Sequence, residues 1–364
     1  MECPVHMIIA VGGTGGHLFP AQAFAHSMLR DHSHIRITFV GSGLKNNAYF
    51  EKDHFDFLDI KSAAPMTKHP IRFILAWLSI LQGLICCMKF YKKNMPQLIV
   101  GFGSYHTFPA LLAGKLKKIG IIIFEPNVFP GRVNRFFSKW AKCVAIQFPH
   151  TSNYLKASNT CVHMSVLKKR EDVTMQRARD YFHLDPERLT LLVFGGSQGA
   201  HKINQLFCGA LEILITHGWT LQVIHILGRN KDVELHKFYH KQGILACVKS
   251  FEERMDYAWA AASLNISRAG ASTLSELIEF TVPTIFIPYP FSTEHHQEKN
   301  AAYVANIIRG GVMLEESKLN ARILAEVITD LLSRKQLPVM RQALHRFKEQ
   351  TKKEDGYSFV LHNL

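Results

Sequence analysis

Four short apolar segments each run into a glycine-rich turn, and a stretch with helical character follows each turn. The segments span residues 6–11, 98–100, 190–194 and 263–267. Strands that are apolar on both faces and alternate with helices are typical of a parallel α/β sheet. Because the pattern restarts near residue 190, we expect two doubly wound Rossmann-like domains that face one another across a cleft. A chain of 364 residues is long enough for two such cores.

The domain boundary is expected in the polar stretch 159–173, so that residues 1–162 form the first domain and 163–339 the second. A basic segment at 337–351 predicts a helix near the C-terminus. We expect the stretch of about 340–364 to pack back on the first domain.

Composition excludes several classes of protein. With 47% hydrophobic and 20% charged residues, the chain is neither disordered nor a collagen or coiled-coil rod. Its seven cysteines show no C-x-x-C pair and no zinc-ligand spacing, so free thiols in a reducing cytosol are expected and a disulfide scaffold is excluded. The apolar N-terminal stretch is one strand long and lacks a cleavage site, unlike a signal peptide.

The positive charge is concentrated in the first half. Of the net +14, residues 1–165 contribute +11, and between residues 60 and 165 the only acidic residue is Glu125. Such a basic half suits an anionic partner: nucleic acid, an anionic membrane surface or a phosphorylated substrate. A basic surface that only keeps the protein soluble is the alternative.

One segment of the basic half is strongly apolar. The uncharged run Phe73–Met88 is 16 residues long, short of the ~20 that span a bilayer, and lysines flank it. Its helical spacing predicts a helix that lies in the membrane interface. A buried core helix is the alternative. The residues expected to contact the membrane are Phe73, Trp77, Ile80, Leu81 and Leu84.

The glycine turns favour phosphate binding but exclude two familiar motifs. In parallel sheets, ligands bind at the carboxyl ends of strands, where backbone N–H groups and helix N-termini attract anions. None of the turns fits G-x-x-x-x-G-K-[ST], so a P-loop ATPase is not expected. The turns after Val11 and Phe194 also fail the G-x-G-x-x-G spacing, which disfavours a nicotinamide dehydrogenase.

The turns occur in a recognisable order. G-G-T-G-G-H at 12–17, G-F-G-S-Y at 101–105, E-P-N at 125–127, G-G-S-Q-G-A at 195–200, R-A-G-A-S-T-L-S-E at 268–276 and H-H-Q-E-K-N-A at 295–301 follow one another. This set, over roughly residues 6–345, resembles the MurG glycosyltransferases of glycosyltransferase family 28. The resemblance implies the two-domain GT-B fold and inverting transfer of N-acetylglucosamine from UDP-N-acetylglucosamine to lipid I. The product would be lipid II for peptidoglycan, on which cell shape and division depend.

The resemblance assigns the nucleotide sugar to the second domain. Glu276 matches a carboxylate that accepts hydrogen bonds from the ribose hydroxyls, and Ser197 matches a diphosphate contact. Gln297 and Asn127 match contacts to the donor sugar, and Lys168 and Glu252 match positions around the nucleotide. The turn that faces the diphosphate would comprise Ala271, Ser272, Thr273, Leu274 and Ser275.

The first domain would hold the acceptor. Thr14, Gly15 and Gly16 match positions near the junction of donor and acceptor, and His17 is the expected base for the acceptor's 4-hydroxyl. An unperturbed imidazole, with a pKa of about 6.5, is largely available as a base near neutral pH. Glu125 is the rival base, and its alternative roles are to orient His17 or to bind the acceptor. Asn134 matches a polar position of the family without an assigned role.

The resemblance also implies the setting of the reaction. No Asp-x-Asp triplet occurs, so neither a metal nor another cofactor is expected, and helix N-termini would stabilise the departing UDP. The enzyme would be peripheral at the cytoplasmic face of a bacterial inner membrane. UDP-N-acetylglucosamine, undecaprenyl-linked lipid I and an anionic membrane surface would be its partners, together with other proteins of cell-wall synthesis and division.

Three positions depart from the family pattern. Phe124 stands where the family has a histidine, Lys168 where it has an arginine, and Glu252 where it has an apolar residue. Related readings are a GT-B transferase for another lipid acceptor and a UDP-N-acetylglucosamine 2-epimerase. A nucleic-acid-binding protein would explain the charge, but no helix-turn-helix or aromatic-basic RNA motif is evident.

Overall fold

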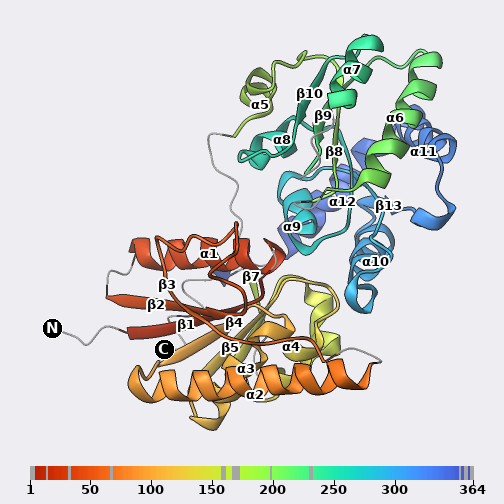
Figure 1. Ribbon diagram of the computed structural model, residues 1–364. Coiled ribbons are helices and arrows are strands. Elements are labelled where there is room, and N and C mark those ends of the chain that lie inside the picture. Colours follow the sequence, from red (N-terminus) through yellow and green to blue (C-terminus); the bar gives the residue numbers. More distant parts are fainter. Residues whose placement is uncertain are drawn as a thin grey trace. The chain divides into compact units, whose positions relative to one another are not determined.

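The computed structural model describes residues 5–13, 15–31, 34–65, 69–156, 161–165, 173–196, 199–228, 233–351, 354–355 and 360. The chain divides into two compact units. The first unit contains Met1–Val166 and Lys352–Leu364, and the second contains Leu167–Thr351. Figure 1 shows both as sheets flanked by helices, as the alternation of apolar segments and glycine turns predicts.

The first unit is built on an eight-stranded parallel sheet in the order β14-β7-β6-β5-β4-β1-β2-β3. The order 3-2-1-4-5-6 within it is that of a Rossmann fold. The chain reverses the direction of strand addition between β1 and β4, which are neighbours in register from Met7 and Leu98 onward. The strands are β1 Val5–Val11, β2 Ile35–Gly41, β3 Asp56–Asp59, β4 Leu98–Gly101, β5 Gly120–Glu125, β6 Cys143–Ile146, β7 Cys161–Ser165 and β14 Glu354–Asp355.

Helices pack on both faces of this sheet and bury two apolar layers. One layer lies under α1 and includes Phe24, Phe39 and Phe102. The other lies under α2, α3 and α4 and includes Tyr91, Leu111 and Phe137. The helices are α1 Gly15–Asp31, α2 Pro70–Lys93, α3 Phe108–Leu116 and α4 Arg132–Ser138, with short 3₁₀ turns at Tyr105–Thr107 and Pro149–Tyr154.

The second unit repeats the same topology with six parallel strands in the order β10-β9-β8-β11-β12-β13. Its reversal point lies between β8 and β11. The strands are β8 Leu189–Phe194, β9 Leu221–Ile226, β10 Ala246–Lys249, β11 Leu264–Ser267, β12 Thr284–Phe286 and β13 Gly311–Met313.

The helices of the second unit cover its sheet over a core that includes Phe207, Leu211 and Ile328. They are α5 Met175–Tyr181, α6 His201–Thr216, α7 Val233–Lys241, α8 Met255–Ala261, α9 Ala271–Phe280, α10 His296–Ala302, α11 Ala321–Ser333 and α12 Gln336–Gln350, with 3₁₀ turns at Thr293–His295 and Glu316–Lys318 and a π-helical segment at Tyr303–Ile308.

The C-terminal part of the chain differs from the sequence expectation. Helix α12 ends at Gln350 and packs against α9 and α11 of the second unit, because the apolar side chains of Met340, Ala343 and Leu344 are buried there. The chain returns to the first unit only after Thr351. There β14 pairs with β7, and Val360 is fully buried in the core under α1.

Candidate active site

The reversal point of the first sheet brings the turns after β1 and β4 together. A side chain at Gly12 would collide with Ser104, so the two turns approach as closely as a glycine allows. Ser104 itself has a φ of 80°, a left-handed conformation that costs a non-glycine residue energy. Such reversal points, at the carboxyl ends of the strands, are where Rossmann-like folds bind ligands.

His17 lies at this point. It is the third residue of α1, and its imidazole ring borders both Gly12 and Gly103. The Asn134 side chain borders Gly103 as well. His17 is partly exposed, and Gly16 beside it is exposed. The imidazole is therefore close to the Asn134 side chain while it remains open to solvent.

Glu125 is the hydrogen-bond acceptor for Asn134 and for the loop that precedes it. It ends β5, is 1% exposed, and accepts four hydrogen bonds. Its Oε1 accepts from the backbone N–H of Asn127 at 2.9 Å and from its Nδ2 at 3.1 Å. Its Oε2 accepts from the Gly131 N–H at 2.9 Å and from Asn134 Nδ2 at 2.8 Å. The carboxylate thereby ties the loop between β5 and α4 to both of its ends.

Burial raises the pKa of the Glu125 carboxyl, although these four hydrogen bonds act in the opposite direction. Two carboxylate oxygens offer about four acceptor positions, so the four donors use the capacity of the group. Asn134 also donates to the Phe124 carbonyl at 3.2 Å, while its Oδ1 is buried without a hydrogen-bond partner among the described residues.

Phe124 is a core residue. It is 1% exposed and packs edge-on against Phe102, with ring centroids 5.1 Å apart. The side chain that replaces the histidine of the family pattern therefore lies in the apolar layer under α1.

The second reversal point has the same construction. A side chain at Gly195 would collide with the backbone of Ala200, so the turn after β8 folds tightly back before α6 begins. On the neighbouring strand, α9 begins directly after the turn that follows β11. Its N-cap residue is Gly270, which offers no side chain to the first N–H groups of the helix. An uncapped N-terminus of this kind is suited to a phosphate group.

Glu276 lies in the second turn of α9. It accepts a hydrogen bond from the indole Nε1 of Trp259 at 2.5 Å. Trp259 belongs to α8, is fully buried, and packs edge-on against Phe194 at the end of β8. Burial raises the pKa of the Glu276 carboxyl to about 7, against the indole N–H, which lowers it.

An ion pair and hydrogen bonds to other parts of the second unit hold the turn before α9 in place. The Arg268 guanidinium forms an ion pair with Glu316 at 2.5 Å and donates to the Ile287 carbonyl at 2.9 Å. Asn300 of α10 donates to the Ala269 carbonyl at 3.1 Å. Gln297, one turn earlier in α10, accepts from the Tyr289 N–H at 3.0 Å. These bonds fix the loops around the N-terminus of α9 relative to one another.

The other expected residues of α9 differ in exposure. Ala271 and Ser272 are partly exposed at the start of the helix, whereas Thr273 and Ser275 are buried. Leu274 is fully buried in the core, and its backbone N–H donates to the Gly270 carbonyl at 3.1 Å, so its side chain and its N–H are not available to a ligand.

Glu252 is buried, forms one ion pair and accepts two further hydrogen bonds. It is 5% exposed and accepts from Lys249 Nζ at 2.6 Å, the Arg254 N–H at 2.7 Å and the Tyr181 hydroxyl at 3.2 Å. Burial raises the pKa of its carboxyl, but these bonds outweigh burial and hold it below the usual range. The side chain fixes its own loop, which explains how a charged residue occupies an apolar position of the family pattern.

Some expected residues have no described geometry. Thr14, Lys168 and Ser197 lie outside the described residues, and of Gly15 only its position at the start of α1 is described. Their roles remain predictions. Among the residues that the structure describes, no three His, Cys, Asp or Glu side chains cluster as metal ligands would.

The exposed face of α2 is not quite the one expected. Ile80 is 5% exposed and faces the core, and Leu84 packs against the layer under α2. The buried side of α2 is rotated about the helix axis from the side that was expected. It comprises Ile80 together with Ala76, Gly83, Cys87 and Tyr91. Phe73, Trp77 and Leu81 are exposed as expected. The other exposed apolar residues are Ile71, Ile74, Leu75, Leu78 and Ile85.

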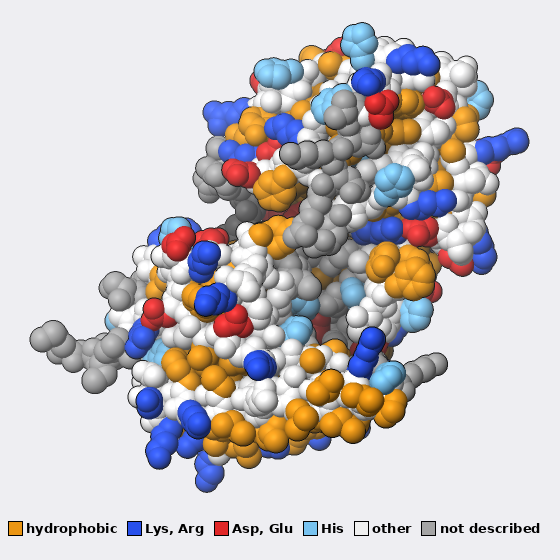
Figure 2. Space-filling model, viewed as in Figure 1, with side chains coloured by type: hydrophobic (Ala, Val, Ile, Leu, Met, Phe, Trp, Pro, Cys, Tyr) orange, Lys and Arg blue, Asp and Glu red, His pale blue; other side chains and the backbone are white. Residues whose placement is uncertain are grey.

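These side chains form an apolar strip along α2, which Figure 2 shows in orange. By length and composition alone, α2 could also cross a bilayer. A spanning helix would, however, have to withdraw Cys87 and Tyr91 from the core layer in which both are fully buried.

Family models match both units of the chain. Residues 7–146 match the glycosyltransferase family 28 N-terminal domain, and residues 190–354 match its C-terminal domain. The chain belongs to glycosyltransferase family 28. It has the GT-B fold of that family, with one Rossmann-like unit for each of the two domains.

Relatives within family 28 align with this protein over nearly its full length. An enzyme of Protochlamydia amoebophila is 38% identical over 94% of this chain and 91% of its own. One of Chlamydia pneumoniae is 33% identical over 97% and 96%. Both are named UDP-N-acetylglucosamine–N-acetylmuramyl-(pentapeptide) pyrophosphoryl-undecaprenol N-acetylglucosamine transferase. Acinetobacter baumannii MurG is similar in structure, with a TM-score of 0.78 at 24% identity and 99% coverage of both chains.

Trp259 was missed from the sequence, and neither Asn134 nor Arg268 was given a role there. Trp259 and Arg268 hold Glu276 and its turn, and Asn134 holds Glu125. Arg268 begins the motif at 268–276, so the sequence pointed to this position. Trp259 gave none, because it comes 17 residues before its partner on a different helix.

Proposed function

We propose that this chain transfers N-acetylglucosamine from UDP-N-acetylglucosamine to the 4-hydroxyl of the N-acetylmuramyl unit of lipid I, which yields lipid II. The observation that carries the proposal is the 38% identity, over 94% of the chain, to a relative named for this reaction. The reversal point of each sheet, where folds of this kind bind ligands, offers one candidate site in each unit and supports the proposal.

The donor is proposed to bind the second unit. The diphosphate would lie at the uncapped N-terminus of α9, near Ser272 and Ser197, where N–H groups and the helix dipole favour negative charge. Glu276 would accept hydrogen bonds from the ribose hydroxyls through the oxygen that Trp259 leaves free. Gln297 and Asn127 would contact the sugar.

The acceptor is proposed to bind the first unit with His17 as the general base. His17 takes the proton of the 4-hydroxyl while that oxygen attacks the anomeric carbon of N-acetylglucosamine. The bond from this carbon to the β-phosphate oxygen breaks, and UDP leaves with the electron pair from the opposite face, which inverts the configuration. The helix N-terminus stabilises the charge that develops on UDP, an effect commonly worth about 3 kcal/mol per donor.

Glu125 is proposed to position the acceptor loop rather than to take the proton. Its acceptor positions are already filled by Asn127, Gly131 and Asn134. A base must have a lone pair directed at the proton that it removes. His17 borders the same glycine turn and is partly exposed, which fits the role better.

The enzyme is proposed to dock on the cytoplasmic face of an anionic inner membrane through the exposed strip of α2. Trp77, Leu78 and Leu81 would enter the interface, while Lys92 and Lys93 at the end of α2 would contact headgroups. This placement brings the enzyme to a lipid-linked acceptor. Other proteins of cell-wall synthesis and division are the partners expected there.

The test is transfer of radiolabelled N-acetylglucosamine to a synthetic lipid I analogue in the presence of a chelator. We expect a labelled disaccharide product that is lost in Glu276→Ala. If the nucleotide sugar binds but no product forms, the acceptor assignment is wrong and other lipids are the next candidates. If the nucleotide sugar does not bind at all, the donor assignment is wrong.

A further inference from the structure

The turn after β1 lies between the ends of β4 and β2, and a side chain holds it on the β2 side. Asn47 Nδ2 donates to the Gly13 carbonyl oxygen at 2.6 Å. The chain is closely packed here, because a Cβ atom at Gly13 would lie 3.1 Å from the Ser42 carbonyl oxygen, just beyond β2. Asn47 thereby joins the loop between β2 and β3 to the turn, four residues before His17 in the sequence.

The Gly13 carbonyl lies outside the helical hydrogen bonds of α1. This helix begins at Gly15, and helical hydrogen bonds start at the carbonyl of the residue directly before the first helical one. The Gly13 carbonyl precedes that point, so the bond from Asn47 fixes its orientation. His17 lies in the first turn of α1, and the way the chain enters the helix therefore determines where its imidazole lies.

The Asn47 side chain is itself held in position. Its Oδ1 accepts from the Tyr49 N–H at 2.9 Å, as in an Asx turn. Its own N–H donates to the Leu44 carbonyl at 3.1 Å, and its carbonyl accepts from the Phe50 N–H at 3.3 Å. Leu44 and Phe50 are buried in the layer under α1. Because Oδ1 faces an N–H and Nδ2 faces a carbonyl, only one orientation of the amide satisfies both partners.

The rest of this loop follows α1 away from the turn. Gln22 Nε2 donates to the Tyr49 carbonyl at 3.1 Å, and its Oε1 accepts from the Glu51 N–H at 2.9 Å. The Glu51 carboxylate pairs with His26 Nε2 at 2.6 Å. Residues 47–51 therefore run along the helix, and the Asn47 bond lies at the end beside the turn.

We propose that Asn47 is a positioning residue for the transfer reaction: it holds the turn after β1 so that His17 is directed at the acceptor hydroxyl. The inference rests on the proposed function, in which His17 is the base and the turn lies at the junction of donor and acceptor. Asn47 touches neither substrate. It should therefore act on kcat and not on the KM for UDP-N-acetylglucosamine, which binds the second unit.

The test is the kinetics of Asn47→Asp with a synthetic lipid I analogue. This variant keeps the acceptor oxygen for the Tyr49 N–H but places an ionised carboxylate oxygen against the Gly13 carbonyl, where neither group can donate. We expect kcat at about pH 8 to fall about 10- to 100-fold, because a misplacement of about 1 Å can cost that much. The KM for UDP-N-acetylglucosamine should stay within about twofold of wild type.

Acid should partly rescue the same variant. A protonated carboxyl regains one O–H donor for the Gly13 carbonyl, and this bond raises the pKa of the new carboxyl above its ordinary value of about 3.9. The ratio of wild-type to variant kcat should therefore shrink at least about threefold between about pH 8 and about pH 5. A loop that is only destabilised would show no such recovery.

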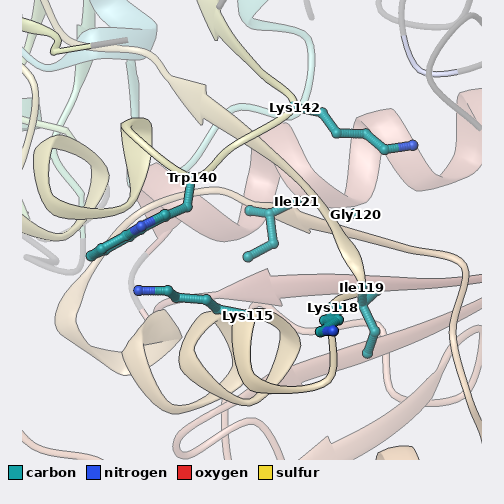
Figure 3. Close-up of a pocket in the computed structure, with 7 residues that line it drawn as sticks. All are labelled: Lys115, Lys118, Ile119, Gly120, Ile121, Trp140 and Lys142. Carbon is teal, nitrogen blue, oxygen red and sulfur yellow. The ribbon is translucent and has the colours of Figure 1, made fainter. Parts of the chain in front are cut away.

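Three control variants separate this bond from other effects, and each should keep kcat within about twofold of wild type. Asn46→Asp makes the same substitution at the neighbouring exposed residue. Glu51→Gln weakens the contact with His26 at the other end of the loop. Lys142→Gln is remote, since Lys142 lines a hollow at the start of β5 (Figure 3), at the opposite edge of the sheet from the turn.

Three kinetic results would overturn the proposal. A kcat of Asn47→Asp within about twofold of wild type would show that the turn is positioned without this bond. An equal loss in Asn46→Asp or Glu51→Gln would mean that charge or general anchoring of the loop is responsible. A loss that appears in the KM for UDP-N-acetylglucosamine, or that does not recover in acid, would exclude a positioning role through the Gly13 carbonyl.

The link between Asn47 and His17 can also be tested without the transfer reaction. In protein with isotope-labelled histidine, the NMR signals of the His17 imidazole are identified by their loss in His17→Gln. They should shift in Asn47→Asp at about pH 8 and stay in place in Asn46→Asp. Unshifted signals would overturn the proposal. An inactive wild type whose signals shift in this way would refute the transferase assignment and leave the link between Asn47 and His17 standing.

Discussion

At the scale of single residues, the carboxylates of the two candidate sites differ in how many acceptor positions remain open. Glu125 receives four donors, whereas the described contacts of Glu276 include one, from Trp259. A saturated carboxylate stabilises a loop, and an unsaturated one can bind a ligand. This difference separates a positioning role from a binding role.

Substitution of His17 tests the assignment of the base. We expect His17→Gln to lower turnover about 100- to 10,000-fold, because general-base catalysis contributes that much, while the Kd for UDP-N-acetylglucosamine stays within about twofold. Steady-state kinetics and calorimetry measure the two quantities. A loss of turnover below about tenfold would argue against His17 as the base.

Glu125→Gln tests the positioning role. The amide nitrogen would face N–H donors, so at least one hydrogen bond is lost at a cost of about 1–3 kcal/mol in stability. Turnover should fall, but the pH profile of kcat should keep the wild-type shape, because the base is unchanged. A profile that loses its acidic limb would identify Glu125 as the base instead.

Glu276 makes stability and donor binding depend on pH in opposite directions. Its pKa of about 7 in the folded protein exceeds the ordinary 4.5, so the folded state holds the extra proton between these values. The free energy of unfolding therefore falls as pH rises through that window. Glu276→Gln removes this loss and should be more stable than the wild type at about pH 8, on the order of 2 kcal/mol, but not at about pH 4.

Ribose hydroxyls donate to the ionised carboxylate, so affinity for UDP-N-acetylglucosamine should rise about tenfold from pH 6 to pH 8 in the wild type. Glu276→Gln should bind more weakly, with little pH dependence. Denaturant titration and calorimetry check the two effects. A pH-independent wild-type affinity would show that Glu276 is already ionised in the free protein.

At the scale of elements, the sequence predicted α2 but not which side of it faces the core. Apolar residues surround most of the helix, so spacing alone leaves the rotation about its axis undetermined. The small side chains of Ala76 and Gly83 settle it, because they lie in the stripe that packs on the sheet. Ile80 falls in the same stripe and is therefore buried.

Two neighbouring positions test this rotation. Leu81→Glu replaces a 51% exposed side chain, so we expect little change in unfolding free energy and a clear loss of binding to anionic vesicles. Ile80→Ala should cost about 2–4 kcal/mol and leave vesicle binding by the folded protein unchanged. Chemical denaturation and vesicle sedimentation separate the two outcomes, and the reverse pattern would place Ile80 on the membrane face.

The strand–turn–helix units were the most predictable elements. Their apolar segments and glycines are local signals, and both reversal points follow from them. The bonds that make each site work cross between elements. Trp259 to Glu276 and Asn134 to Glu125 join different helices and strands, so a linear pattern cannot reveal them.

At the scale of the whole molecule, the domain boundary was predicted more closely than the end of the chain. The polar linker lies at the division between the units, but α12 belongs to the second unit. Its buried residues Met340 and Leu344 give no sign in the sequence of which core they enter.

Removal of residues 352–364 tests the contribution of the returning segment. The first unit would lose β14 and the buried Val360, which should lower its unfolding free energy by at least about 1–3 kcal/mol. The affinity of the second unit for UDP-N-acetylglucosamine should not change. Limited proteolysis with mass spectrometry would locate the loosened unit, and Val360→Ala is the milder control. Uniform resistance to proteolysis would contradict the expectation.

The return of the chain to the first unit also orders events during synthesis. Residues 5–165 leave the ribosome first, yet their sheet lacks β14, and the core under α1 lacks Val360, until residues 167–351 have followed. At 5–20 residues per second this takes roughly 10–40 s. During that interval β7 presents an open edge to any other strand in the cell. The newly synthesised enzyme can therefore complete the folding of its second unit before that of its first.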